Sequence, residues 1–199
     1  MRREYIKDND TPQPDIPFAE DCIFYAPLSY NDLTDHISGV QGVIQSGTTL
    51  EWNSNLSMYL IKNDYLSNAQ AQGGVWFDIP GFQKPFTLFA RIQEVANDYL
   101  WDYVVDVTNV SGANNYPFSK GYFSSLSTLC KCVLVCYTSG TTYYYKNSSK
   151  VSTLNWTSSP IFNRIKLVTN NSGYKINHSY VSDVRVYNRT LSDSEIAQL

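Results

Sequence analysis

The sequence predicts an all-β protein, an antiparallel sandwich of two sheets with a short C-terminal helix. Apolar and polar residues alternate in many short segments separated by Gly, Asn and Ser, which is the pattern of half-buried strands. Aromatic residues, including 16 Tyr and 4 Trp, make up 15% of the chain, and they favour strands. No helical periodicity of useful length occurs before the last eight residues. Many short strands with frequent turns are typical of two facing sheets.

The strands are expected, in chain order, at 22–27, 42–45, 48–52, 58–61, 75–79, 86–92, 101–108, 130–137, 141–147, 164–169 and 182–188. The segment 130–137 is the most apolar, so we expect it to be a central strand. A Ser-Gly turn separates it from 141–147, which predicts a hairpin.

Two of these strands alternate clearly enough to assign their faces. In 86–92, the residues Phe86, Leu88, Ala90 and Ile92 share one face, which we expect to point into the core. In 101–108, the alternation separates two sets of four side chains. One set contains Trp101, Tyr103, Val105 and Val107, and the other contains Asp102, Val104, Asp106 and Thr108. We expect the two aspartates to lie on a solvated face.

The last eight residues predict a short, capped helix. Ser192 and Glu195 have the spacing of a capping box, and Leu191 and Ile196 flank them as a hydrophobic staple. So short a helix does not persist alone. Its apolar residues must therefore dock on a larger body.

The bulk properties bound the domain organisation and the classes of partner. At 199 residues and 43% hydrophobic content, the chain is large enough for one domain with its own core. The net charge of −3 argues against nucleic acid or anionic membrane as partners. No apolar stretch approaches the roughly 18–20 residues that span a bilayer, and no apolar segment follows the N-terminal basic residues, so neither membrane insertion nor a secretion signal is expected.

We expect two parts, an extended arm at 1–20 and a sandwich domain at 21–199. The arm is charged, contains Pro12, Pro14 and Pro17, and has little to bury. Such an arm is expected to dock on a partner, which would make the chain part of a homo-oligomer or a larger assembly.

The four cysteines are Cys22, Cys130, Cys132 and Cys136. The last three share parity on one strand, so they point to one face and do not readily bridge one another. We expect buried free thiols, with a bridge from Cys22 left open. With only two histidines in the chain, a zinc site is not expected.

Several segments resemble laminin-G-like domains of the concanavalin A-like lectin/glucanase family. The closing segment is the most specific of them. The segments are FYAPL (24–28), DLTDHISG (32–39), FDIPGFQKPFTLFARI (77–92), CYTSGTTYYYKNSSKVST (136–153), FNRIKLV (162–168) and YVSDVRVYNRTLSDSEIAQL (180–199). The resemblance implies a jelly-roll sandwich whose last strand lies beside the first and whose small helix covers the sandwich end. One departure is Asn147-Ser148-Ser149, where the family has an Asn-Gly turn, so this hairpin is expected to be longer or differently shaped.

Catalysis is not expected. The glycosidase branch of the resembling family carries a Glu-x-Asp-x-x-Glu strand, which brings carboxylates to either side of a sugar bond. This chain has no such triplet, and its nearest pair is Asp102 and Asp106. It also has no nucleophile elbow, phosphate-binding loop or dinucleotide motif.

A shallow glycan site is the binding hypothesis. Aromatic rings stack on sugar faces while Asn and Asp side chains bind the hydroxyls, and the segments 97–103 and 111–123 interleave both kinds of residue. If the two segments share one rim, the site would contain Asp98, Tyr99, Trp101, Asn114, Asn115 and Tyr116. The alternative is that Trp101 belongs to the core and the asparagines form turns.

No cofactor is expected. Calcium often accompanies laminin-G-like modules, and Asp32, Asp35 and Asp98 are candidate ligands. No binding motif supports them.

Three functions remain open on the sequence alone. The first is a non-catalytic bacteriophage virion surface component, a capsid- or tail-attached fibre or decoration protein that adheres to carbohydrate or docks other virion proteins. The second is a secreted or cell-surface carbohydrate-binding module of a bacterium, located outside the cell. The third is a purely structural assembly or spacer protein without a ligand.

Overall fold

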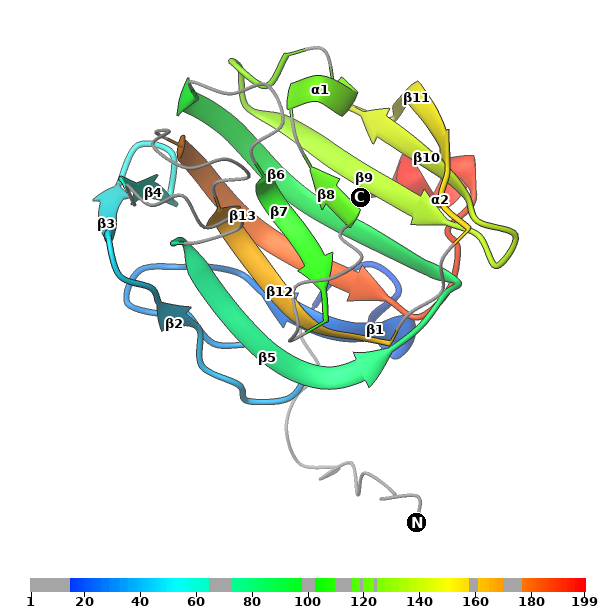
Figure 1. The fold of residues 1–199 in the computed structure, drawn as a ribbon, viewed down its shortest axis with the longest axis horizontal. Helices are drawn as coiled ribbons and strands as arrows, with labels where there is room; N and C mark the ends of the chain where they lie inside the picture. Colours follow the sequence, from blue (N-terminus) through cyan, green and yellow to red (C-terminus); the bar gives the residue numbers. More distant parts are fainter. Residues whose placement is uncertain are drawn as a thin grey trace.

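The structure, a computed structural model, describes residues 15–64, 73–97, 103–109, 116–118, 120–123, 125–157, 161–169 and 177–199. Two antiparallel sheets face each other (Figure 1), which confirms the predicted all-β sandwich. In the described residues, three short helical segments accompany them, η1 (Ala19–Asp21), α1 (Lys120–Phe123) and α2 (Asp193–Ile196). In the described part of the chain no helix is long and apolar enough to cross a membrane.

The large sheet contains eight strands. Its order is β11 (Ser149–Asn155), β10 (Thr141–Lys146), β9 (Cys130–Cys136), β6 (Phe86–Asn97), β13 (Asn177–Tyr187), β4 (Met58–Asn63) and β3 (Thr48–Asn53). The eighth strand, β1 (Cys22–Ala26), pairs with the end of β13, so the last strand lies beside the first as the resemblance implied. The most apolar segment, β9, is an interior strand and forms the predicted hairpin with β10.

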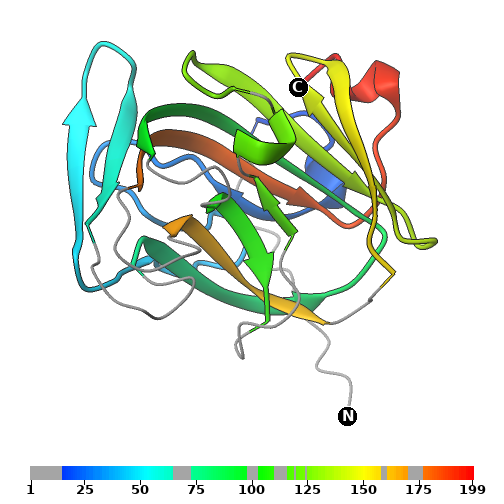
Figure 2. The same cartoon turned by 45° about the horizontal axis from the view of Figure 1, so that its top comes forward.

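The small sheet contains five strands. Its order is β2 (Val43–Ile44), β5 (Val75–Phe82), β12 (Phe162–Thr169), β7 (Tyr103–Thr108) and β8 (Tyr116–Phe118). Figure 2 shows this sheet as a separate layer from the sheet that contains β6 and β13. The strands β8 and β11 were not expected from the sequence.

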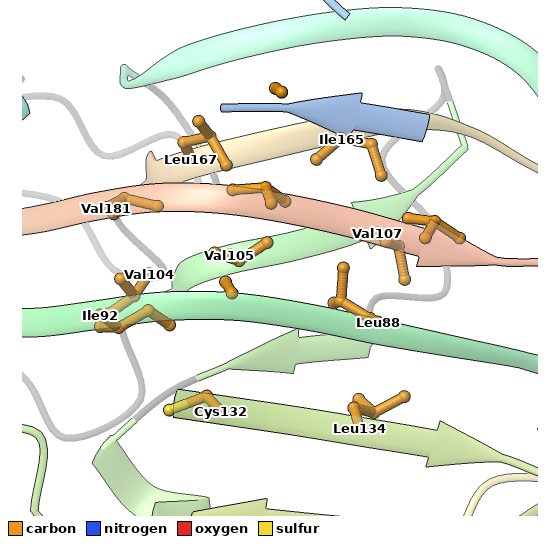
Figure 3. Packing of buried hydrophobic residues seen from close by; sticks show 14 of the residues in the cluster. Leu88, Ile92, Val104, Val105, Val107, Cys132, Leu134, Ile165, Leu167 and Val181 are labelled. Carbon is orange, nitrogen blue, oxygen red and sulfur yellow. The ribbon is translucent and has the colours of Figure 1, made fainter. Parts of the chain in front are cut away.

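The main core lies between the two sheets. Phe86, Leu88, Ala90 and Ile92 all belong to it, as the alternation of β6 predicted. Figure 3 shows Leu88 and Ile92 with Leu134 of β9 and Val105 of β7 among the packed side chains. Val104 also joins this cluster, although alternation placed it on the opposite face of its strand from Val105.

A second apolar cluster covers the outer face of the large sheet. Phe89 of β6 and Val133 of β9 belong to it, and they alternate with core residues, so they point away from the small sheet. Leu191, Ile196 and Leu199 pack on them. The predicted capping box of α2 is present. The helix therefore plugs the outer face of the large sheet, rather than the sandwich end.

The described part of the N-terminal arm contributes to the same cluster. Ile16 is buried there, Phe18 packs against it, and the Tyr187 hydroxyl donates to the Pro17 carbonyl at 3.1 Å. Residues 16–18 of the arm thus contact the sandwich, while residues 1–14 lie outside the described part of the chain.

All four cysteines are buried free thiols. Cys130, Cys132 and Cys136 lie in the main core, and Cys22 lies in the second cluster on the other face of the large sheet. The open possibility of a bridge from Cys22 is therefore not realised.

The prediction that Asp106 lies on a solvated face of β7 is wrong. Asp106 is fully buried, and Lys166 lies directly opposite on the neighbouring strand β12. Burial lowers the pKa of Lys166, and the Asp106 carboxylate acts against that shift. The strand carries a charge toward a buried face because a neighbouring strand supplies the opposite charge there. The other aspartate of the expected face, Asp102, lies outside the described residues.

Candidate functional site

The predicted glycan site falls mostly outside the described residues. Asp98, Tyr99, Trp101, Asn114 and Asn115 all lie there. Tyr116 begins β8, for which the structure describes the backbone. The glycan site therefore stays a prediction.

The strand register does bear on whether the two segments of that site share a rim. Tyr103, the first residue of β7, ends the segment 97–103, whereas Tyr116 of the segment 111–123 pairs with Val107 near the other end of the strand. Four steps of about 3.3 Å separate Tyr103 from Val107, or about 13 Å. The two segments are therefore anchored at opposite ends of β7.

A pocket of about 430 Å³ lies elsewhere, beside the middle of β6, where β9 begins and β10 turns into β11. The described residues that line it are Arg91, Leu129, Cys130, Lys131, Asn147 and Ser148. Arg91 is two residues from Phe89 and Lys131 is two residues from Val133 of the second cluster, so their side chains also point to the outer face of the large sheet.

Two positive charges meet in this pocket. Arg91 and Lys131 are directly opposite each other across the β6–β9 pair. Neither forms an ion pair with any residue in the described ranges. Like charges placed directly opposite on one face destabilise a sheet, so packing alone does not favour this arrangement.

The acidic side chain that interacts electrostatically with both cations is Asp183, and it is already bound to Arg185. A bulge in β13 places Asp183 at a positive φ. Its two carboxylate oxygens accept from Nε and Nη2 of Arg185 at 2.6 and 2.7 Å. Burial raises the pKa of Asp183, and Arg185, then Arg91 and Lys131, act against that rise. Three cations around one carboxylate leave this part of the outer face positive.

A tight turn forms another wall of the pocket. Asn147 and Ser148 join β10 to β11 with φ of 48° and 65°, the left-handed values of a two-residue hairpin turn. Asn147 anchors the turn to β9, because its Oδ1 accepts from the Lys131 amide at 3.0 Å and its own amide donates to the Lys131 carbonyl at 2.9 Å. The hairpin therefore keeps two residues despite the missing glycine, contrary to the longer turn expected from the sequence.

Replacing Ser148 with glycine is expected to stabilise the protein by about 0.5–1 kcal/mol. A left-handed conformation costs a non-glycine residue about 1–2 kcal/mol, and the greater chain entropy of glycine offsets part of that gain. Chemical denaturation measures the difference. The matched control, Ser149→Gly in β11, should instead lose about 0.5–1 kcal/mol. A Ser148→Gly protein no more stable than the wild type would show that this φ is not strained.

The candidate calcium ligands Asp32 and Asp35 are occupied by their own loop. The Asp35 carboxylate accepts from the amides of Tyr25, Ile37 and Ser38 at 2.9–3.2 Å. Asp32 accepts from the Thr34 amide at 2.9 Å and contacts His36 Nε2 at 2.6 Å. The third candidate, Asp98, lies outside the described residues. In the ranges the structure covers, no three acidic, histidine or cysteine residues are grouped to hold a metal ion.

Sequence reasoning missed Arg91 and Lys131. Alternation within β6 and β9 places each on a non-core face, and that much was available from the sequence. Their pairing depends on the register between strands 40 residues apart in the chain.

Comparisons with known proteins agree on the fold. No protein-family model matches the chain, and no curated protein matches it either. Among solved structures, the binding domain of Paraclostridial Mosquitocidal Protein 1 matches with a TM-score of 0.61 and 11% identity, over 89% of this chain and 51% of that one.

Two botulinum neurotoxin structures match similarly. The binding domain of neurotoxin DC, solved with rat synaptotagmin II, has a TM-score of 0.59 and 12% identity, over 89% of this chain and 50% of that one. A type C structure, reported with cell entry that depends on two ganglioside molecules, has a TM-score of 0.59, 11% identity and the same coverage.

At such low identity these likenesses show the fold alone. The chain spans about half the length of the solved structures it matches. Their sandwich is compatible with the resemblance to laminin-G-like domains, and this chain shares the β-sandwich architecture of toxin binding domains.

Proposed function

We propose that this chain is a non-catalytic recognition module that binds carbohydrate in the pocket beside Arg91 and Lys131. The observation that carries the proposal is a hollow of about 430 Å³ whose described walls present uncommitted hydrogen-bond donors. Arg91, Lys131 and Ser148, whose side chains can donate hydrogen bonds, all line it. Sugars offer many oxygen acceptors within a small volume, and binding sites are concave surfaces with a few such polar groups.

The structural neighbours support a binding role in general. They are receptor-binding domains of toxins, and the names of two of them refer to gangliosides and to synaptotagmin II. Half of each neighbour has no counterpart in this chain, so their ligands do not transfer to it directly. The pocket in this chain therefore has to be tested on its own residues.

The other functions predicted from the sequence gain no distinguishing support. Nothing in the described residues bears on virion partners, on docking through the arm at 1–20, or on location at a virion or bacterial surface. These stay predictions. A structural spacer would need no pocket and would bind no sugar.

A glycan array followed by calorimetry with the best ligand tests the proposal. We expect binding by the wild type and at least about 10-fold weaker binding by Leu129→Trp, which fills the pocket without changing its charge. The control Val43→Trp adds the same bulk at an exposed position of β2 on the other sheet and should bind normally. Absence of binding to every glycan at millimolar concentration would leave the spacer hypothesis instead.

A further inference from the structure

Arg91 and Lys131 are like charges on facing positions, and their repulsion destabilises the sheet. The two side chains project from facing positions on adjacent strands, where Cβ atoms are about 4.5–5.5 Å apart. Each has an ordinary structural alternative, because an uncharged polar residue at either position would keep the alternation of the outer face. An anion between the two groups would relieve their mutual repulsion.

Among the described residues, the nearby Asp183 carboxylate does not balance both positive charges. Asp183 is bound through both oxygens by Arg185, and Lys62 and His178, on the same face, have Glu51 and Asp64 as their own partners. The whole chain carries a net charge of −3, so the positive pocket is a local feature against the overall charge. A single opposed pair also differs from the stripe of basic residues that binds nucleic acid.

We infer that the ligand of this pocket is an acidic sugar, whose carboxylate or sulfate group binds between Arg91 and Lys131. This inference rests on the proposed function and names its ligand class. A planar guanidinium donates two parallel hydrogen bonds to such a group, and an ammonium adds a third charged donor from the opposite strand. Ser148 also lines the pocket, and its hydroxyl could bind a neutral hydroxyl of the same sugar.

The experiment compares three oligosaccharides that differ only at C6 of the terminal residue. One ends in glucuronic acid, one in glucose and one in glucose 6-sulfate. We expect the unaltered chain to bind one or both charged forms about 10- to 100-fold more tightly than the neutral form, the effect of one charge-assisted hydrogen bond. Raising the salt concentration should narrow the difference by screening the charges.

Two variants then locate the effect. Arg91→Gln and Lys131→Gln should each weaken binding of the charged sugar about 10-fold and leave binding of the neutral sugar unchanged. Lys62→Gln removes one positive charge from the same face and should behave as the wild type. Circular dichroism confirms that each variant is folded, and the ligand comparison on the unaltered chain does not depend on any of them.

The possible failures are distinct. Equal affinity for the three sugars overturns the inference and leaves carbohydrate binding in place. A preference for the charged sugar that survives both glutamine variants places the anion elsewhere and also overturns it. Absence of binding to all three, and to every sugar of the array, overturns the inference and the proposed function together.

Discussion

Replacing Leu88 with aspartate is expected to abolish the cooperative fold. Leu88 is fully buried between the sheets, and on its own sheet it faces Leu134 of β9 and Val186 of β13. A carboxyl group there would have no described cation beside it, because its cross-strand neighbours are apolar. Burying an unpaired charge costs more than 4–5 kcal/mol, roughly the whole stability of a marginal domain. Circular dichroism should show no cooperative melting transition.

The control for this change lies on the same strand. Val95 of β6 is 54% exposed, so Val95→Asp places the same new charge in contact with water. It should melt within a few degrees of the wild type. If Leu88→Asp melted as Val95→Asp does, the assignment of the inner face of β6 would be wrong.

Removing residues 191–199 is expected to produce the second large effect. Leu191, Ile196 and Leu199 are buried on the outer face of the large sheet. Each contributes about 1.5–3 kcal/mol on burial, so the truncation should cost about 4–9 kcal/mol and expose Phe89 and Val133 to solvent. Urea denaturation measures the loss, and binding of a hydrophobic dye reports the uncovered face.

The matched control is Gln198→Ala, which changes an exposed side chain in the same segment. It should alter stability by less than about 0.5 kcal/mol. A truncated chain that unfolds at the urea concentration of the wild type would show that the C-terminal segment is not a structural plug. The pocket beside Arg91 is formed by strands of the large sheet. Sugar binding by the truncated chain would therefore report whether the large sheet still folds.

Local chemistry explains why several features were predictable. The alternation in β6 distinguishes inner from outer side chains at every step, because successive side chains of a strand point to opposite faces. The capping box of α2 depends on residues three apart, Ser192 and Glu195. Free thiols at Cys130 and Cys132 follow from their shared parity.

Features that depend on a neighbouring element were missed. The polar alternation of β11, whose side chains are mostly exposed, offers no apolar face to detect, and the strand forms because β10 is available to pair with it. Ile16 is buried because the outer face of the large sheet lies beside it. The isolated pattern of β7 does not reveal that Lys166 will face Asp106.

The sequence by itself determined the β class, the inner face of β6 and the capping of the final helix, because each depends on side chains a few residues apart. Only the tertiary structure decided that Arg91 and Lys131 meet, that Asp183 is already taken by Arg185, and that the Asn147–Ser148 turn closes the pocket beside them. These relations depend on the register of strands that are distant in the chain. A shift of one residue would turn either cation toward the core, and no local pattern specifies which position on one strand faces which position on another.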